Sequence, residues 1–212
     1  MKQTKLQNMV LLALFIAIIA LMAFVPYLGY IKVPFLAIQA TTIHIPVIIG
    51  AIILGPKAGA VLGAVFALTS LINNTTQPGL TSFCFSPFIQ IGDGLGGSPL
   101  ALIVCFVPRI LCGIVPYFVY KAIEKTSSQG KSRQSISLPL AGIAGSMTNT
   151  ILVMSLIYIF FGQQYAAARS IAFDAVFGVI LSVIAINGTV EAIISAIIAA
   201  AVCAAILKIR KI

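Results

Sequence analysis

Six apolar runs, separated by short polar stretches, make up most of this chain of 212 residues. The hydrocarbon core of a bilayer is about 30 Å thick, and an α-helix needs about 20 mainly apolar residues to cross it. Hydrophobic residues form 60% of the sequence and charged residues only 8%, a composition typical of membrane-spanning proteins. The sequence therefore predicts an all-α, polytopic membrane protein with one transmembrane domain over residues 1–212. The six predicted helices lie at about 6–25, 38–54, 58–72, 99–123, 138–161 and 175–207.

Two junctions between the runs are irregular. The second and third runs are short and meet at Gly55-Pro56-Lys57, which predicts a turn that ends one helix and begins the next. The last run is longer than one crossing needs and contains Asn187-Gly188. Its first part is therefore either a separate turn or a broken start of the helix.

Lysine and arginine are unevenly divided between the two sides of the predicted bundle. Cytoplasmic loops near membrane segments are enriched in these cations. Ten of them fall on the side that holds both termini, only Lys32 and Arg169 fall on the other side, and Arg109 lies within a helix. We therefore expect both termini in the cytoplasm. This topology also accounts for the net charge of +9 without a nucleic-acid partner.

Residues 73–98 form a predicted outer loop that is far longer than a hairpin between two helices needs. The loop is rich in glycine, proline, asparagine, threonine and phenylalanine and carries no cation. Its apolar side chains, among them Phe83, Phe85 and Phe88, argue against free disorder. We expect a lid that folds over an outward-facing cavity.

The sequence offers little for catalysis. A phosphate-binding loop that ends in Gly-Lys-Ser or Gly-Lys-Thr is missing from it. One histidine, four acids and four cysteines without zinc-type spacing do not make a convincing metal site or catalytic set. We therefore expect no enzyme activity, no metal and no cofactor in this chain.

Arg109 is a charged residue inside an apolar run. A charge at bilayer depth costs roughly 2.5–3.5 kcal/mol on insertion scales, so such residues usually face a polar cavity or a partner. Two roles are open. Arg109 either forms two hydrogen bonds to the carboxylate of a ligand or makes a structural ion pair with Glu191.

Other polar residues are expected at a similar depth in the outer half of the bundle, because each residue of a helix advances 1.5 Å. Asn149 offers both a donor and an acceptor to an amide or hydroxyl, or bonds to a neighbouring helix instead. Asn187 and Glu191 lie in the outer half of the last run. His44 lies near the outer end of the second run, where packing is the simpler role. Together these residues can form one pocket.

Small residues recur at helical spacing on two runs. Ala13 and Ala17 lie four residues apart in the first run, and Gly55, Gly59 and Gly63 follow the same spacing around the third. Such spacing lets two helices approach closely. We expect the glycines to pack inside the bundle. The alanines either pack inside it as well or bind a partner.

These segments together resemble the substrate-binding S components of energy-coupling factor (ECF) vitamin transporters. The resemblance covers most of the chain and includes Ala13-Leu14-Phe15-Ile16-Ala17, Leu54-Gly55-Pro56-Lys57-Ala58-Gly59 and the long outer loop. Three further segments are most similar to the pantothenate-specific members of that family. They are Thr41-Thr42-Ile43-His44-Ile45, Val107-Pro108-Arg109-Ile110-Leu111 and Gly145-Ser146-Met147-Thr148-Asn149-Thr150.

The resemblance implies high-affinity binding of a small water-soluble vitamin, with pantothenate favoured, on the outer side of a bacterial plasma membrane. It implies a transmembrane T subunit that contacts Ala13 and Ala17, and two cytoplasmic ATPase subunits that use ATP and Mg. Arg109 and Asn149 carry over to the vitamin pocket, and His44, Asn187, Glu191 and Phe85 are further candidates.

The chain departs from the family in having no tryptophan, a residue that its lids and pockets often use. Phe83, Phe85 or Phe88 would have to supply that contact. Two alternatives remain open: an S component for another vitamin, or a stand-alone ion-coupled carrier in which Glu191 titrates. A membrane enzyme fits the residues least well.

Overall fold

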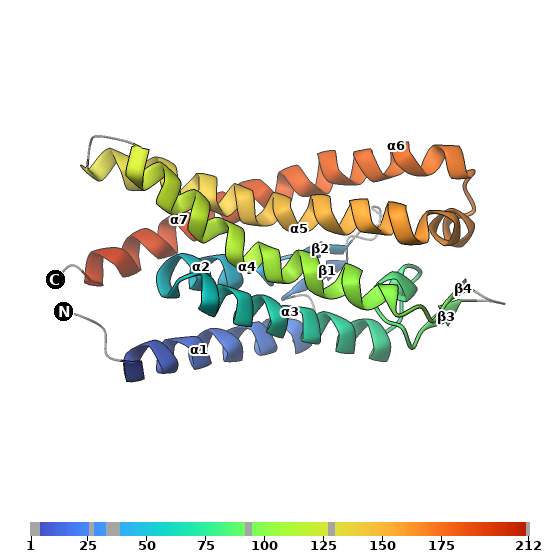
Figure 1. Cartoon of the computed structure of the whole chain (residues 1–212), viewed down its shortest axis with the longest axis horizontal. Coiled ribbons are helices and arrows are strands. Elements are labelled where there is room, and N and C mark those ends of the chain that lie inside the picture. The colour runs from blue at the N-terminus through green and yellow to red at the C-terminus, as the bar shows by residue number, and fades with distance from the viewer. Residues whose placement is uncertain (1–4, 26–27, 33–38, 92–94, 127–129, 211–212) are drawn as a thin grey trace.

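The structure is a computed structural model that describes residues 5–25, 28–32, 39–91, 95–126 and 130–210. Most of this part of the chain is helical, and the longest helices run roughly along the long axis of the molecule (Figure 1). The α-helices are α1 (Lys5–Phe24), α2 (His44–Leu54), α3 (Pro56–Thr76), α4 (Leu100–Thr126), α5 (Gly130–Arg169), α6 (Phe173–Val183) and α7 (Thr189–Arg210).

Five helical segments of the described chain are long and apolar enough to cross a membrane. Four are α1, α3, α4 and α5, and the fifth is the continuous C-terminal helix made of α6, the π-helical segment η2 (Ile184–Gly188) and α7. The helix α2 has 11 residues, which is too short to cross a bilayer alone. The predicted helical membrane bundle is thus confirmed in its class. The start of α1 and the end of α7 lie at the same end of it (Figure 1).

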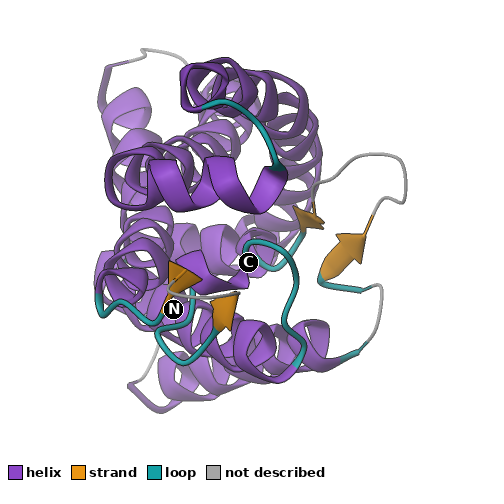
Figure 2. Cartoon of the chain, turned by 90° about the vertical axis from the view of Figure 1, so that its right-hand side faces the viewer, coloured by secondary structure: helices purple, strands orange, loops and turns teal. Residues whose placement is uncertain are grey.

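The second apolar run begins as a strand. β1 (Tyr30–Lys32) and β2 (Gln39–Thr41) pair antiparallel, with Tyr30 opposite Thr41, and α2 begins only at His44. The prediction of a helix from residue 38 is therefore wrong for Gln39–Thr41, because an apolar run alone does not separate a buried strand from a buried helix. The strand pair lies among the helices of the bundle (Figures 1 and 2).

Glycines allow α3 to pack closely against its neighbours. Gly55 joins α2 to α3 with a φ of 95°, which glycine adopts without strain, and Pro56 occupies the first turn of α3, where its missing N–H costs nothing. A Cβ at Gly59 would overlap the carbonyl oxygen of Gly113, and a Cβ at Gly63 would overlap that of Arg109. The backbones of α3 and α4 therefore touch, and the packing role predicted for Gly59 and Gly63 is confirmed. The same prediction is wrong for Gly55, where a Cβ would meet nothing within 4 Å.

The C-terminal half contains the longest elements. α5 extends over 40 residues and ends at Arg169, beyond the apolar run that predicted it. A turn with Ser170 at a φ of 53° leads into α6. The irregularity expected at Asn187-Gly188 is the π-helical segment η2 within a continuous helix.

The buried apolar residues form two clusters. One packs α1, α2 and α3 together around residues such as Phe15 and Phe66. The other joins the outer loop to α4, α5 and α6, where the ring centroids of Phe83 and Phe161 lie 6.0 Å apart in edge-to-face geometry. Large apolar side chains on α1 and α7 are exposed, as expected of surfaces in contact with lipid.

The outer loop is partly ordered. It contains the short 3₁₀ helix η1 (Ser82–Cys84) and the strand pair of β3 (Gln90–Ile91) and β4 (Leu95–Gly96). The end-on view shows this second strand pair to one side of the helices (Figure 2).

Candidate functional site

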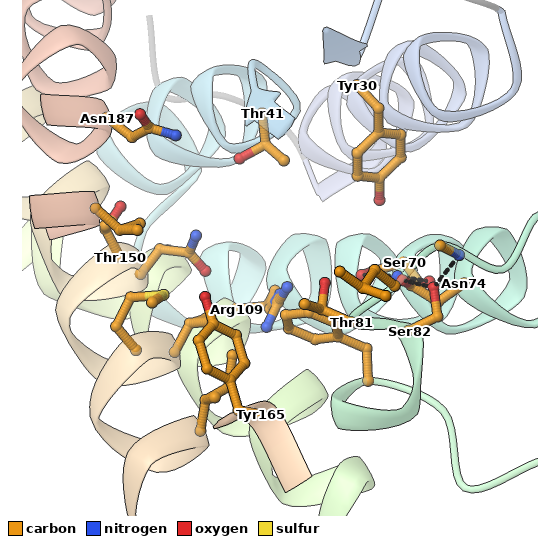
Figure 3. A pocket seen from close by; sticks show the side chains of 18 of the residues that line it. Tyr30, Thr41, Ser70, Asn74, Thr81, Ser82, Arg109, Thr150, Tyr165 and Asn187 are labelled. Carbon is orange, nitrogen blue, oxygen red and sulfur yellow. Dashed lines mark hydrogen bonds between the residues drawn. The ribbon is translucent and has the colours of Figure 1, made fainter. Parts of the chain in front are cut away.

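A cavity of about 340 Å³ lies inside the bundle, within the range of roughly 300–1,000 Å³ typical of small-molecule sites. Its wall is built from strands β1 and β2, α3, the first part of the outer loop, α4, α5, the end of α6, η2 and α7. Polar side chains from these elements point toward a common space (Figure 3). Val153, Met154 and Ile157 of α5 supply an apolar part of the wall.

Arg109 lies in the wall of the cavity, and only 6% of it is exposed. Its Nη1 donates a hydrogen bond of 2.8 Å to the carbonyl oxygen of Val104. Its guanidinium carbon lies 4.9 Å from the ring centroid of Phe85 and 5.6 Å from that of Phe66, within the range of cation–π attraction. The charge thus lies close to two aromatic rings at the cavity surface.

Arg109 and Glu191 share the cavity without forming an ion pair. Among the described residues, the ion pair within 4 Å is Lys121–Glu124, on the exposed side of α4. Nothing in the structure therefore supports the structural Arg109–Glu191 pair considered above. The buried charge of Arg109 has no acidic partner at contact distance, and a buried cation of this kind is strongly stabilised by an anionic ligand.

Glu191 is instead held by threonines. One carboxylate oxygen accepts hydrogen bonds from the Thr41 backbone N–H at 2.8 Å and from the Thr41 hydroxyl at 3.3 Å. The other accepts one from the Thr150 hydroxyl at 3.1 Å. Glu191 thereby links α7 to β2 and to α5, three segments that are far apart in the sequence.

The buried polar atoms of cavity-lining residues that lack a hydrogen-bond partner within the described chain include the Tyr30 hydroxyl, Arg109 Nε and Asn149 Oδ1. Burial raises the pKa of the Tyr30 phenol above its ordinary value, while the positive charge of Arg109 acts in the opposite direction. Because unpartnered buried polar atoms are rare in native proteins, these three indicate a ligand that has both donors and acceptors.

Asn187 reaches the cavity from the π-helical segment η2. Its amide faces the same space as Thr41 and Thr150 (Figure 3). Single π turns inside α-helices occur frequently at functional sites, which agrees with this placement.

The first part of the outer loop lines the cavity, and its role as a lid stays a prediction. Gly79, Ser82 and Phe85 are among the lining residues. The Ser82 hydroxyl donates to Asn74 Oδ1 at 2.8 Å and accepts a bond of 2.8 Å from the Gly79 backbone N–H. These bonds attach the loop to the end of α3 (Figure 3).

His44 does not belong to the cavity wall. It is buried at the start of α2, and its Nε2 lies 2.7 Å from the Ser195 hydroxyl of α7. Ala13 and Ala17 are both exposed on α1, so internal packing does not account for their spacing. Their role in partner binding stays a prediction.

Sequence reasoning missed several lining residues. Tyr30 lies in a strand that was not predicted, and Arg169 was assigned to an outer loop although α5 continues to it. The guanidinium carbon of Arg169 lies 4.9 Å from the ring centroid of Tyr165, which also lines the cavity. The i, i+4 spacing of this pair on one helical face is the signal that could have revealed it.

The fold and the cavity define a helical membrane protein with an internal cavity of small-molecule size, lined by both polar and apolar side chains. Residues 7–203 match the family described as ECF transporter, substrate-specific component. The chain belongs to this family, which confirms the resemblance inferred from its motifs. It is accordingly a transport protein and not an enzyme.

Two relatives of this chain are named for their substrate. The chain is 39% identical over 190 residues to the pantothenic acid transporter PanT of Lactococcus lactis subsp. cremoris, a match that covers 87% of this chain and 92% of the relative. It is 26% identical over 189 residues to the pantothenate transporter PanT of Leuconostoc mesenteroides subsp. mesenteroides, covering 88% and 85% respectively.

Proposed function

We propose that this chain binds pantothenate in the cavity from the outer side of a bacterial plasma membrane and delivers it to an ATP-driven ECF transporter. The names of its relatives support the substrate, and its family supports the mode of transport. The observation that carries the proposal is Arg109, a buried cation in a cavity wall with no acidic partner within ion-pair distance.

Pantothenate has a carboxylate at one end, and a guanidinium is the side chain best suited to bind it. Arginine presents planar N–H donors that can bind both oxygens of a carboxylate. In Arg109 one N–H of Nη1 donates to the Val104 carbonyl, while Nε–H has no partner among the described residues. The ligand carboxylate would satisfy these remaining donors and neutralise the buried charge.

The rest of pantothenate has an amide, two hydroxyls and a dimethyl group, and the cavity offers a partner for each. Asn149 Oδ1 and the Tyr30 hydroxyl are unpartnered, so they are available to the amide and hydroxyls. Val153, Met154 and Ile157 form an apolar wall for the dimethyl group. Asn187 lies near these groups as a further polar contact (Figure 3).

The partners follow from the family. We infer a transmembrane T subunit and two cytoplasmic ATPase subunits that use ATP and Mg. The exposed Ala13 and Ala17 on α1 support a close helix–helix contact with the T subunit. Cytoplasmic termini agree with the distribution of lysine and arginine and place both chain ends beside the ATPases.

The test is calorimetric titration of the purified, detergent-solubilised chain with pantothenate, repeated with Arg109→Ala. We expect the parent to bind tightly and the variant to lose at least about a hundredfold in affinity, since removing a charged hydrogen-bonding partner costs roughly 2–5 kcal/mol. Lys121→Ala, which removes an exposed charge of α4, is the control and should bind like the parent.

Unchanged binding by a folded Arg109→Ala would refute the carboxylate role. A folded parent that does not bind pantothenate would reject this substrate, and other vitamins would then be screened. Uptake into vesicles by the purified chain alone, without the partner subunits, would show an ion-coupled carrier instead.

A further inference from the structure

Pro108 precedes Arg109 in the interior of α4. Proline lacks a backbone N–H, so it cannot donate the helical hydrogen bond to the carbonyl four residues earlier, and its ring pushes that carbonyl aside. The carbonyl in question belongs to Val104, which is fully buried. A buried carbonyl without a partner is costly, so another donor is needed.

That donor is Arg109 itself. Its Nη1 lies 2.8 Å from the Val104 oxygen, so the side chain folds back along its own helix and replaces the missing backbone bond. The proline therefore creates the acceptor that the next residue uses. Pro108 thus leaves the Val104 carbonyl without its helical donor, and the hydrogen bond to this carbonyl orients the side chain of Arg109.

This orientation matters because the guanidinium sits on a long flexible side chain, and holding such a side chain in one rotamer is entropically unfavourable. The rings of Phe66 and Phe85 lie close to the guanidinium carbon and restrict its position. The rings do not select among the N–H groups of the guanidinium. A hydrogen bond to one of these groups does, because it leaves the others available to a ligand. The bond to Val104 uses one of the two N–H groups of Nη1, and Nε–H has no partner among the described residues.

We propose that Pro108 is a positioning residue for ligand selectivity: by freeing the Val104 carbonyl, it holds the Arg109 guanidinium in the orientation that binds a carboxylate. The proposal rests on the proposed function, in which that carboxylate belongs to pantothenate. On this proposal, the preference of the cavity for an acid over its uncharged analogue depends on Pro108, although Pro108 offers the ligand no polar group.

The first test uses Pro108→Ala, which restores a backbone N–H able to reclaim the Val104 carbonyl. Binding is titrated with pantothenate and with its uncharged analogue, in which a primary alcohol replaces the carboxylate. We expect about tenfold weaker binding of pantothenate, as for the loss of one well-placed hydrogen bond to a charged group, and binding of the alcohol within about twofold of the parent. Equal losses for both ligands would overturn the proposal, because they would indicate general damage to the site.

Two controls test whether Pro108 acts by orienting Arg109 or by changing the geometry of α4. Pro116→Ala removes the other proline of α4, which is not part of the cavity wall, and it should leave the ratio of the two affinities unchanged. In an Arg109→Gln background, Pro108→Ala should have no further effect on pantothenate binding. An undiminished effect in that background would refute action through Arg109.

A further readout needs no ligand. In ¹⁵N NMR spectra of arginine-labelled protein, with the Arg109 signals assigned by Arg109→Lys, the bond to Val104 should slow rotation of the guanidinium. Pro108→Ala should speed that rotation, and an unchanged rate would overturn the proposal. A parent that fails to bind pantothenate but shows the predicted change in rotation would reject the proposed substrate while retaining the positioning role.

Discussion

Gly63→Ala is a sharp test of how the fold positions Arg109. The added Cβ would overlap the carbonyl oxygen of Arg109 and lie 2.8 Å from the Ile110 Cα, whereas ordinary contacts begin near 3.4 Å. Both obstacles are backbone atoms, so no side chain can move out of the way. The helices α3 and α4 must therefore separate by about 0.6 Å or more, and overpacking of this kind costs roughly 1–3 kcal/mol.

Alanine also has a higher helix propensity than glycine, which offsets about 0.5–1 kcal/mol of that cost. We expect the clash to dominate, with a net destabilisation of about 1–2 kcal/mol and a fall in melting temperature of roughly 2–8 °C. Because a binding site must be held within about 0.5 Å of its working geometry, we also expect pantothenate affinity to fall about tenfold.

The assays are thermal unfolding in detergent and calorimetric titration. The matched control is Gly178→Ala in α6, where a Cβ meets nothing within 4 Å, and it should leave affinity unchanged and stability equal or slightly higher. If Gly63→Ala behaved like Gly178→Ala in both assays, the close contact of α3 and α4 would not be what positions Arg109.

Two further predictions concern Glu191 and the exposed face of α1. Glu191→Ala removes the acceptor of the Thr41 backbone N–H and hydroxyl, whereas the Thr150 hydroxyl keeps the Ser146 carbonyl as an acceptor. It should lower the stability by about 1–3 kcal/mol in thermal unfolding. Glu191→Gln, which keeps an acceptor, should cost less, and equal losses would contradict this role. Ala13→Leu should leave pantothenate binding and stability intact but abolish uptake in cells that contain the partner subunits. The same change at Ala204, an exposed residue of α7, should permit uptake, and normal uptake by Ala13→Leu would argue against docking on that face.

Much of the fold could be predicted because hydropathy and helical rise act locally. The apolar runs predict the long helices. The helical rise of 1.5 Å per residue predicts a similar depth in the outer half of the bundle for Arg109, Asn149, Asn187 and Glu191. The structure brings these four residues and Phe85 to one cavity. Their roles in binding stay predictions.

The remainder depends on contacts that hydropathy does not encode. The strand pairing of Tyr30 with Thr41 is an interaction between two segments, so local sequence patterns do not reveal that Tyr30 lines the cavity. Arg169 was missed because polar residues before it resemble a loop, although packing keeps α5 helical there. His44 was grouped with the site by depth alone, but the direction of its side chain takes it to Ser195.

The π-helical segment η2 has a consequence for how this helix can change in evolution. A turn closed by i→i+5 bonds holds one residue more than an α-helical turn needs, so η2 (Ile184–Gly188) contains a surplus residue. Loss of one codon there would let the segment rewind as an α-helix, with α6 and α7 still facing their present neighbours. The same loss inside α7 would turn all later residues by about 100°. A single insertion is therefore enough to have added Asn187 to an existing helix, and a single deletion is enough to remove it.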